Sequence, residues 1–250
     1  MSFSAVDPAI LVPAFAAGLL VLATHVPLGM QVLKRGIVFI DLAIAQIAGC
    51  GVLAAGLLGG EPQGLPAQAA ALAAALLGAL FLTWTEKRCP EVQEALIGTL
   101  FVLAATGATL LLAGNPHGGE HLKDLLVGQI LWVTRAQLAL MAAVSVLVLA
   151  AWFGPRNRLG ATGFYVAFAV SVTASVQLVG VYLVFASLIV PALAVRGWKR
   201  RPLVAAYALG AAGYAAGLLL SALTDLPTGP LIVWTLAGLA VLVFVWRARR

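Results

Sequence analysis

The stretch IVFIDLAIAQIAGCGVLAAGLLG, residues 37–59, contains a single charged side chain, Asp41, in an otherwise largely apolar run. A helix that crosses the hydrocarbon core of a bilayer needs about 20 predominantly apolar residues, so this stretch is long enough to span a membrane. The whole chain has the same character, since 62% of its 250 residues are hydrophobic and 10% are charged. Soluble domains are typically about a quarter charged, and the composition excludes that class. The sequence therefore predicts an all-α, polytopic transmembrane helical bundle.

Apolar stretches separated by short polar links predict about nine spans, or eight if the two short stretches near Gln177 form one. They cover residues 9–29, 37–59, 67–85, 94–114, 137–153, 163–177, 180–195, 203–222 and 229–246. Residues 125–134 are too few to cross a bilayer and predict an interfacial or re-entrant segment. No repeat or shift in composition divides the chain, so we expect residues 1–250 to form a single transmembrane domain.

Basic residues lie in alternate links between these stretches. All but two of the 15 lysines and arginines are Lys34, Arg35, Lys87, Arg88, Arg156, Arg158, Arg196, Lys199, Arg200, Arg201, Arg247, Arg249 and Arg250. Because cytoplasmic links carry the excess of Lys and Arg, this pattern predicts an N-terminus outside and a cytoplasmic C-terminus. The net charge of +6 is then explained by orientation in membrane lipid, and no nucleic acid partner is expected.

Asp41 is the first candidate functional residue, because an ionisable side chain at bilayer depth costs at least about 2.5–3.5 kcal/mol. His25 lies on the preceding span at a similar expected depth, and imidazole with carboxylate is a common ligand pair for zinc and related cations. Gln46 is about 140° around the helix from Asp41, so one site containing both would need a broken helix. Two interpretations stay open: an intramembrane metal site with Asp41, His25 and Gln46, or hydrogen bonds that join neighbouring spans. Glu94, at the start of its own span, is expected to bond a helix N-terminus.

The outside link NPHGGEHLKD, residues 115–124, contains His117, Glu120 and His121. Their spacing matches a metallohydrolase pattern that requires both histidines on one helix, and the two glycines between them disfavour a helix. A metal-capture or docking loop and a solvated polar loop are the remaining interpretations. A membrane-embedded metalloenzyme would need all three side chains on one helix. The chain has no phosphate-binding loop and no nucleophile motif, so we do not expect it to be an enzyme or to hydrolyse ATP itself.

Three blocks of sequence, in order, carry a resemblance to a known family. They are PLGMQVLKRGIVFIDLAIAQIAG (27–49), EALIGTLFVLAATGATLLL (94–112) followed by LKDLLVGQIL (122–131), and VTASVQLVGVYLVFASLIVPALA (172–194). Together they resemble the membrane-spanning permease subunits of zinc/manganese ABC transporters. The resemblance implies a homodimeric permease of the cell inner membrane, which moves a divalent metal ion by alternating access. It also implies a separate cytoplasmic ATPase subunit and an outer metal-binding protein, with the metal as transported substrate and no permanently bound cofactor.

This sequence departs from the family pattern in two places. In the family an Asp is followed four residues later by His; Asp41 matches, but Ala45 stands at the His position, beside Gln46. His25 is therefore our candidate for the missing ligand. The family's cytoplasmic coupling helix is replaced by the short link GPRNRLGATG, residues 154–163, in which Arg156 and Arg158 are the candidate ATPase contacts.

The short link keeps other functions open. The main alternative is an ATP-independent membrane carrier or channel, for a metal or another small solute, built on the same fold. A purely structural membrane scaffold is a further alternative, in which exchanging Asp41 for Asn would change only stability.

Overall fold

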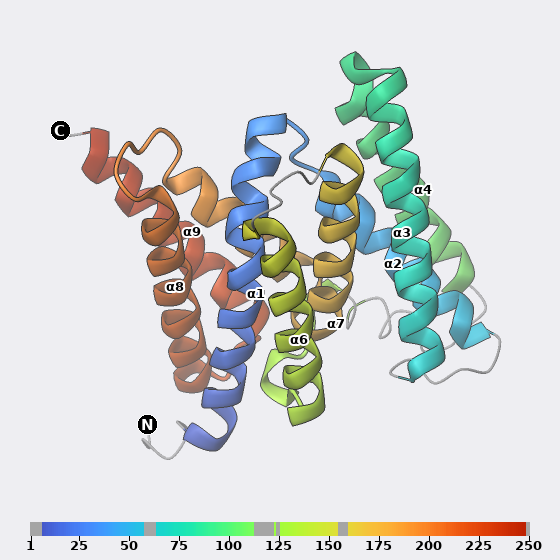
Figure 1. Cartoon of the computed structure of the whole chain (residues 1–250). Helices are drawn as coiled ribbons and strands as arrows, with labels where there is room; N and C mark the ends of the chain where they lie inside the picture. The colour runs from blue at the N-terminus through green and yellow to red at the C-terminus, as the bar shows by residue number, and fades with distance from the viewer. Residues whose placement is uncertain (1–6, 58–63, 113–122, 124–125, 155–159, 249–250) are drawn as a thin grey trace.

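The computed structural model describes residues 7–57, 64–112, 123, 126–154 and 160–248. The long helices are α1 (Pro8–Arg35), α2 (Ile40–Leu57), α3 (Leu65–Arg88), α4 (Gln93–Leu112), α6 (Arg135–Phe153), α7 (Ala161–Ala194), α8 (Pro202–Thr224) and α9 (Thr228–Ala248). Two short 3-10 turns, η2 (Pro90–Val92) and η3 (Ile130–Trp132), lie between them, and the described residues include no strand. The predicted all-α fold class is therefore confirmed (Figure 1).

Seven helices of the described chain are long and apolar enough to cross a membrane, and α2 adds a shorter apolar helix, Ile40–Gly56. The sequence predicted nine stretches because it separated residues 163–177 from residues 180–195. The structure joins these two stretches in the single element α7. The number of crossings stays a prediction, since it depends on how α7 lies in the bilayer.

The helix α7 consists of two limbs that meet at Gly180. This residue has φ +78° and ψ 163°, a backbone conformation that is essentially restricted to glycine. The first limb begins beside the end of α1, where the Arg35 guanidinium lies 4.4 Å from the centre of the Phe164 ring. At Gly180 the chain meets the backbone of Gly128, and the second limb returns to α1, with Leu188 against Gly29.

The segment around Gly128 lies at the opposite end of α1 from Arg35. Residues 127–132 share a cavity with Asp7, Ile10 and Leu11, which belong to the start of α1. The turn of α7 at Gly180 is therefore at that end too, and α7 runs along the bundle and back. Residues 126–134 form no crossing helix and pack through η3 against α1 and α9, as predicted for a segment too short to span.

The ends of the helices that carry basic residues lie together. In Figure 1, α1 and α3 end, α8 begins and α9 ends towards the upper side, whereas α1 begins at the lower side. Basic residues occupy the last turns of α1, α3 and α9, so they share one end of the bundle. This arrangement is the one that the positive-inside pattern requires. Which end faces the cytoplasm stays a prediction, as does the single-domain organisation.

Tight packing in the bundle depends on small residues at helix crossings. Gly213 and Gly217, on α8, lie directly against Leu236 and Ile232 of α9. Small residues allow close approach of helix backbones, which is the main source of helix association in a lipid environment. One buried hydrophobic cluster includes residues from all eight long helices.

Candidate functional site

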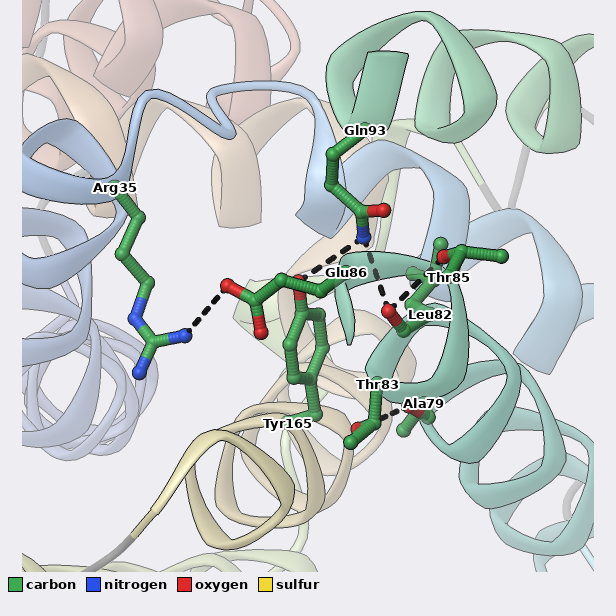
Figure 2. A network of polar contacts seen from close by, with 8 residues as sticks. All are labelled: Arg35, Ala79, Leu82, Thr83, Thr85, Glu86, Gln93 and Tyr165. Carbon is green, nitrogen blue, oxygen red and sulfur yellow. Dashed lines mark hydrogen bonds and ion pairs between the residues drawn. The ribbon is translucent and has the colours of Figure 1, made fainter. Parts of the chain in front are cut away.

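A polar network joins four helices at the end of the bundle where α1 and α3 finish (Figure 2). Nη1 of Arg35 lies 2.9 Å from Oε1 of Glu86, which links α1 to α3. Nε2 of Gln93 donates to the Tyr165 hydroxyl at 3.2 Å and to the Leu82 carbonyl at 3.0 Å, which links α4 to α7 and α3. The network was not predicted from the sequence. Opposite charges at the ends of neighbouring spans were the available signal for the Arg35–Glu86 pair.

The ion pair and the Phe164 contact make Arg35 a testable part of this network. Exchanging Arg35 for Gln removes both interactions, so we expect a loss of about 1–2 kcal/mol of stability. Exchanging Glu86 for Gln removes only the partly exposed ion pair, and the expected loss is about 0.2–1 kcal/mol. Thermal unfolding in detergent would compare the two. Equal losses would show that the aromatic contact contributes nothing.

The start of α2 is held by α4. The backbone N–H of Phe39, one residue before α2 begins, donates to Oε1 of Glu94 at 3.3 Å. Glu94 thus bonds the N-terminal region of a helix, as predicted. Because Phe39 is two residues before Asp41, this contact helps to hold the first turn of α2, which carries Asp41, in place.

Asp41 lies in the first turn of α2 and is 1% exposed. Neither of its carboxylate oxygens has a side-chain partner among the described residues. The backbone amides of Asp41 and Leu42 are the donors close to it. Such amides carry the partial positive charge of a helix N-terminus, which favours an anion but does not neutralise it. The arrangement leaves a buried carboxylate that can accept a cation.

The contacts of α2 show which way Asp41 faces. Ile47 packs on Gly78 of α3, and the Cys50 thiol donates to the Ala104 carbonyl of α4 at 3.1 Å. At 100° per residue, Asp41 lies on the remaining face of α2. Since α2 also packs extensively on α7, this remaining face is directed towards α7.

Gln46 lies on a different face of α2, on the side of Cys50 and α4. It is 3% exposed, and its Oε1 atom is buried without a partner. The helix is continuous from Ile40 to Leu57, so the break that a joint site with Asp41 would need is absent from this described helix. The structure therefore does not bring Asp41 and Gln46 together on α2.

His25 is fully buried on α1. Its Nδ1 atom lies 2.9 Å from the Val21 carbonyl, to which it can donate a hydrogen bond. The other ring nitrogen, Nε2, then carries a lone pair, and it is buried without a partner. A histidine whose second nitrogen donates to a carbonyl is the usual form of a metal-ligating imidazole. His25 therefore has the local chemistry of a metal ligand.

The helix α7 lies between α1, which carries His25, and α2, which carries Asp41. It packs on both α1 and α2, whereas α1 and α2 share little contact with each other. Two further buried hydroxyls without partners, Ser171 Oγ and Thr173 Oγ1, lie on α7 itself. Neither hydroxyl was predicted from the sequence, although a run of hydroxyl residues in an apolar span is a usable signal. In the part of the chain that the structure describes, no three His, Cys, Asp or Glu side chains form a group that could hold a metal.

Some predicted residues lie outside the described residues. These are His117, Glu120 and His121 of the outside link, and Arg156 and Arg158 of the link between α6 and α7. The metal-capture loop and the ATPase contact therefore stay predictions.

A cavity of about 610 Å³ opens at the end of the bundle where α1 begins. Its walls include residues 127–132, the end of α8 and the start of α9, and two carboxylates, Asp7 and Asp225. The Asp7 carboxylate caps α1 by accepting from the Ala9 amide at 2.8 Å. Under the predicted topology this cavity faces the outside.

Comparison with known families identifies the bundle. The family model of the ABC 3 transport family matches residues 7–161 and 156–247. The chain belongs to the ABC 3 transport family. It is thus the membrane-spanning permease subunit of an ABC transporter and a multi-pass membrane protein.

Solved structures share the fold of this ABC 3 permease. The structure of PsaBC from Streptococcus pneumoniae in complex with Fab matches with a TM-score of 0.72 and 20% identity, over 94% of this chain and 89% of that one. An ABC transporter described as being of the metal-chelate type, in an inward-facing conformation, matches with a TM-score of 0.67 and 16% identity, over 94% of this chain and 85% of that one. At such identities the likeness supports the fold alone.

Proposed function

We propose that this ABC 3 permease is the membrane subunit of an importer for a divalent metal ion, zinc or manganese, in the cell inner membrane. In this proposal the ion passes Asp41 as the bundle alternates between outward and inward access. The observation that carries the proposal is the Asp41 carboxylate, which is buried at the start of α2 without a side-chain partner. Family membership and the resemblance of the blocks around Asp41 to zinc/manganese permeases support it.

The negative charge of Asp41 is the physical reason to expect a cation here. An unpaired carboxylate inside a membrane bundle is costly, and such residues typically mark ion pathways. A divalent cation would supply the missing counter-charge, and a carboxylate with an imidazole suits zinc or a similar cation. His25, with its free Nε2, is our candidate for the second ligand. Because α7 lies between the helices that carry these two residues, they would act on the ion in succession or after a movement of α7.

The proposed partners are those of an ABC importer. We propose a homodimer of this chain, two cytoplasmic ATPase subunits and an outer metal-binding protein that delivers the ion. One similar structure is a transporter described as being of the metal-chelate type. Transport of a chelated metal should therefore be compared with transport of the free ion.

Reconstitution tests this function. The permease would be co-expressed with the ATPase subunit of its own system, purified together with it and placed in liposomes with the outer binding protein. We expect uptake of manganese or zinc that depends on ATP, measured by elemental analysis of the vesicles. Uptake of a metal chelate but not of the free ions would change the proposed cargo.

The same vesicles distinguish the ATP-driven importer from an ATP-independent carrier or channel. The short link at residues 154–163 favours an ATP-independent carrier or channel, since it offers an ATPase little surface. Equal uptake with and without the ATPase would establish that alternative. Retention of the ATPase during purification, and its release on exchanging Arg156 and Arg158 for Gln, would support the importer.

A further inference from the structure

The link between α7 and α8, together with the last turn of α9, forms an exposed cationic surface. Its members are Arg196, Lys199, Arg200, Arg201 and Arg247, all of them exposed. The sequence from 195 to 224 contains no Asp or Glu, and the nearest one, Asp225, caps the opposite end of α8. We call these five residues the basic rim.

The basic rim differs from the other group of basic residues at this end of the bundle. There, Arg35 is paired with Glu86, and the sequence after Lys87 and Arg88 soon contains Glu91. Orientation by the positive-inside rule requires only an excess of cations, and both groups supply it. The absence of any carboxylate in the elements that form the basic rim is therefore an additional property.

The shape of the basic rim is fixed by hydrogen bonds. Arg247 donates from Nη1 to the Arg196 carbonyl at 2.7 Å and from Nη2 to the Gly197 carbonyl at 3.2 Å. Gly197 has φ +79°, and the amide of Trp198 donates to the Val195 carbonyl at 3.0 Å, which closes a tight turn. The cations are therefore displayed on a preformed surface at the beginning of α8.

An apolar groove of about 300 Å³ adjoins the basic rim. It lies between α8 and α9, where Ala208 and Ala212 face Leu239 and Val243, and Trp198 of the link also lines it. The alanines leave space that a longer side chain would fill. The Nε1 atom of Trp198, a hydrogen-bond donor, is buried without a partner.

We propose that the basic rim and this groove bind an anionic phospholipid. The groove would hold one acyl chain, and the rim would hold the phosphate. A molecule that is both strongly apolar and negatively charged matches both parts, and basic pockets between membrane helices on the cytoplasmic side are typical sites for anionic headgroups. Trp198 lies where the two parts meet and could donate to a headgroup or ester oxygen. The start of α8 adds positive potential, since Arg201 provides no side-chain cap.

Native mass spectrometry of the purified full-length permease tests this site. Phosphatidylglycerol and phosphatidylcholine with identical acyl chains would be titrated separately, and we expect tighter binding of phosphatidylglycerol. Exchanging Lys199 and Arg200 together for Gln should weaken phosphatidylglycerol binding about 25-fold, at about a factor of five for each cation. The matched control exchanges Lys87 and Arg88 for Gln and should leave binding unchanged.

A second variant separates the headgroup from the chain. Exchanging Ala208 for Phe fills the groove and should displace the lipid, whereas inorganic phosphate should not compete with phosphatidylglycerol. Equal losses in the Lys87/Arg88 control would overturn the proposal, since general electrostatics would then explain binding. Competition by phosphate, with no effect of the Ala208 exchange, would overturn it in favour of a simple anion site. Dissociation of a dimer by the Ala208 exchange, with lipid binding intact, would assign the groove to a second copy and also overturn it.

Discussion

Exchanging Asp41 for Asn should abolish metal uptake in reconstituted vesicles while leaving the protein folded and at least as stable. Asparagine keeps the size of the side chain but removes the charge that a divalent cation needs from a carboxylate ligand. We expect the uptake rate to fall by more than about 10-fold. Loss of a group that only supports a metal ligand already lowers metal affinity or activity by about 10-fold or more. Stability should stay equal or rise, because an unpaired buried charge is removed from the bundle.

Two measurements, uptake and thermal unfolding, are needed on each variant. Thr83→Val is the matched control: Thr83 is also buried in the bundle, but its hydroxyl bonds only the Ala79 carbonyl of its own helix, at 2.8 Å. Unchanged uptake with lowered stability in Asp41→Asn would favour the structural scaffold over the transporter.

In the same assay, His25→Ala tests whether His25 is the second ligand. Full uptake and metal binding without the imidazole would reject His25 as a ligand.

Exchanging Gly180 for Ala should prevent correct folding of the permease. An alanine at φ +78° and ψ 163° is strained, and its Cβ would overlap the backbone of Gly128. Backbone strain of this kind and overpacking each cost about 1–3 kcal/mol, so the expected total is about 2–6 kcal/mol. This is a large part of the stability of a typical domain. Size-exclusion chromatography of a fluorescent fusion, followed by thermal unfolding, would measure the loss of folded protein.

The control for this experiment is Gly107→Ala. Gly107 lies inside α4, and a Cβ there meets nothing within 4 Å. Alanine is favoured over glycine in a helix by about 0.5–1 kcal/mol, so this variant should fold at least as well as the parent. If both exchanges were tolerated equally, the reversal of α7 at Gly180 would not depend on glycine.

The sequence by itself determined the all-α fold class and most helix positions, and it singled out Asp41 as a charge inside an apolar helix. These properties are local. A bilayer requires a long apolar run for each span, and such runs are visible along the chain. A charge within such a run is costly wherever the helix packs, so Asp41 could be singled out without knowing its neighbours. The sequence also predicted that Glu94 would bond a helix N-terminus, and the structure shows that this helix is α2.

The tertiary structure alone decided which polar residues face each other. Hydropathy showed two short apolar stretches but not that they form the two limbs of α7 around Gly180. The sequence placed His25 beside Asp41 because their helices are consecutive, whereas α7 packs between those helices. Helix neighbours in a membrane are chosen by close packing of small residues and by hydrogen bonds between distant segments, and these leave little periodic signal in the chain. A site that used both candidate ligands would therefore depend on α7, a helix that is distant in sequence from His25 and from Asp41.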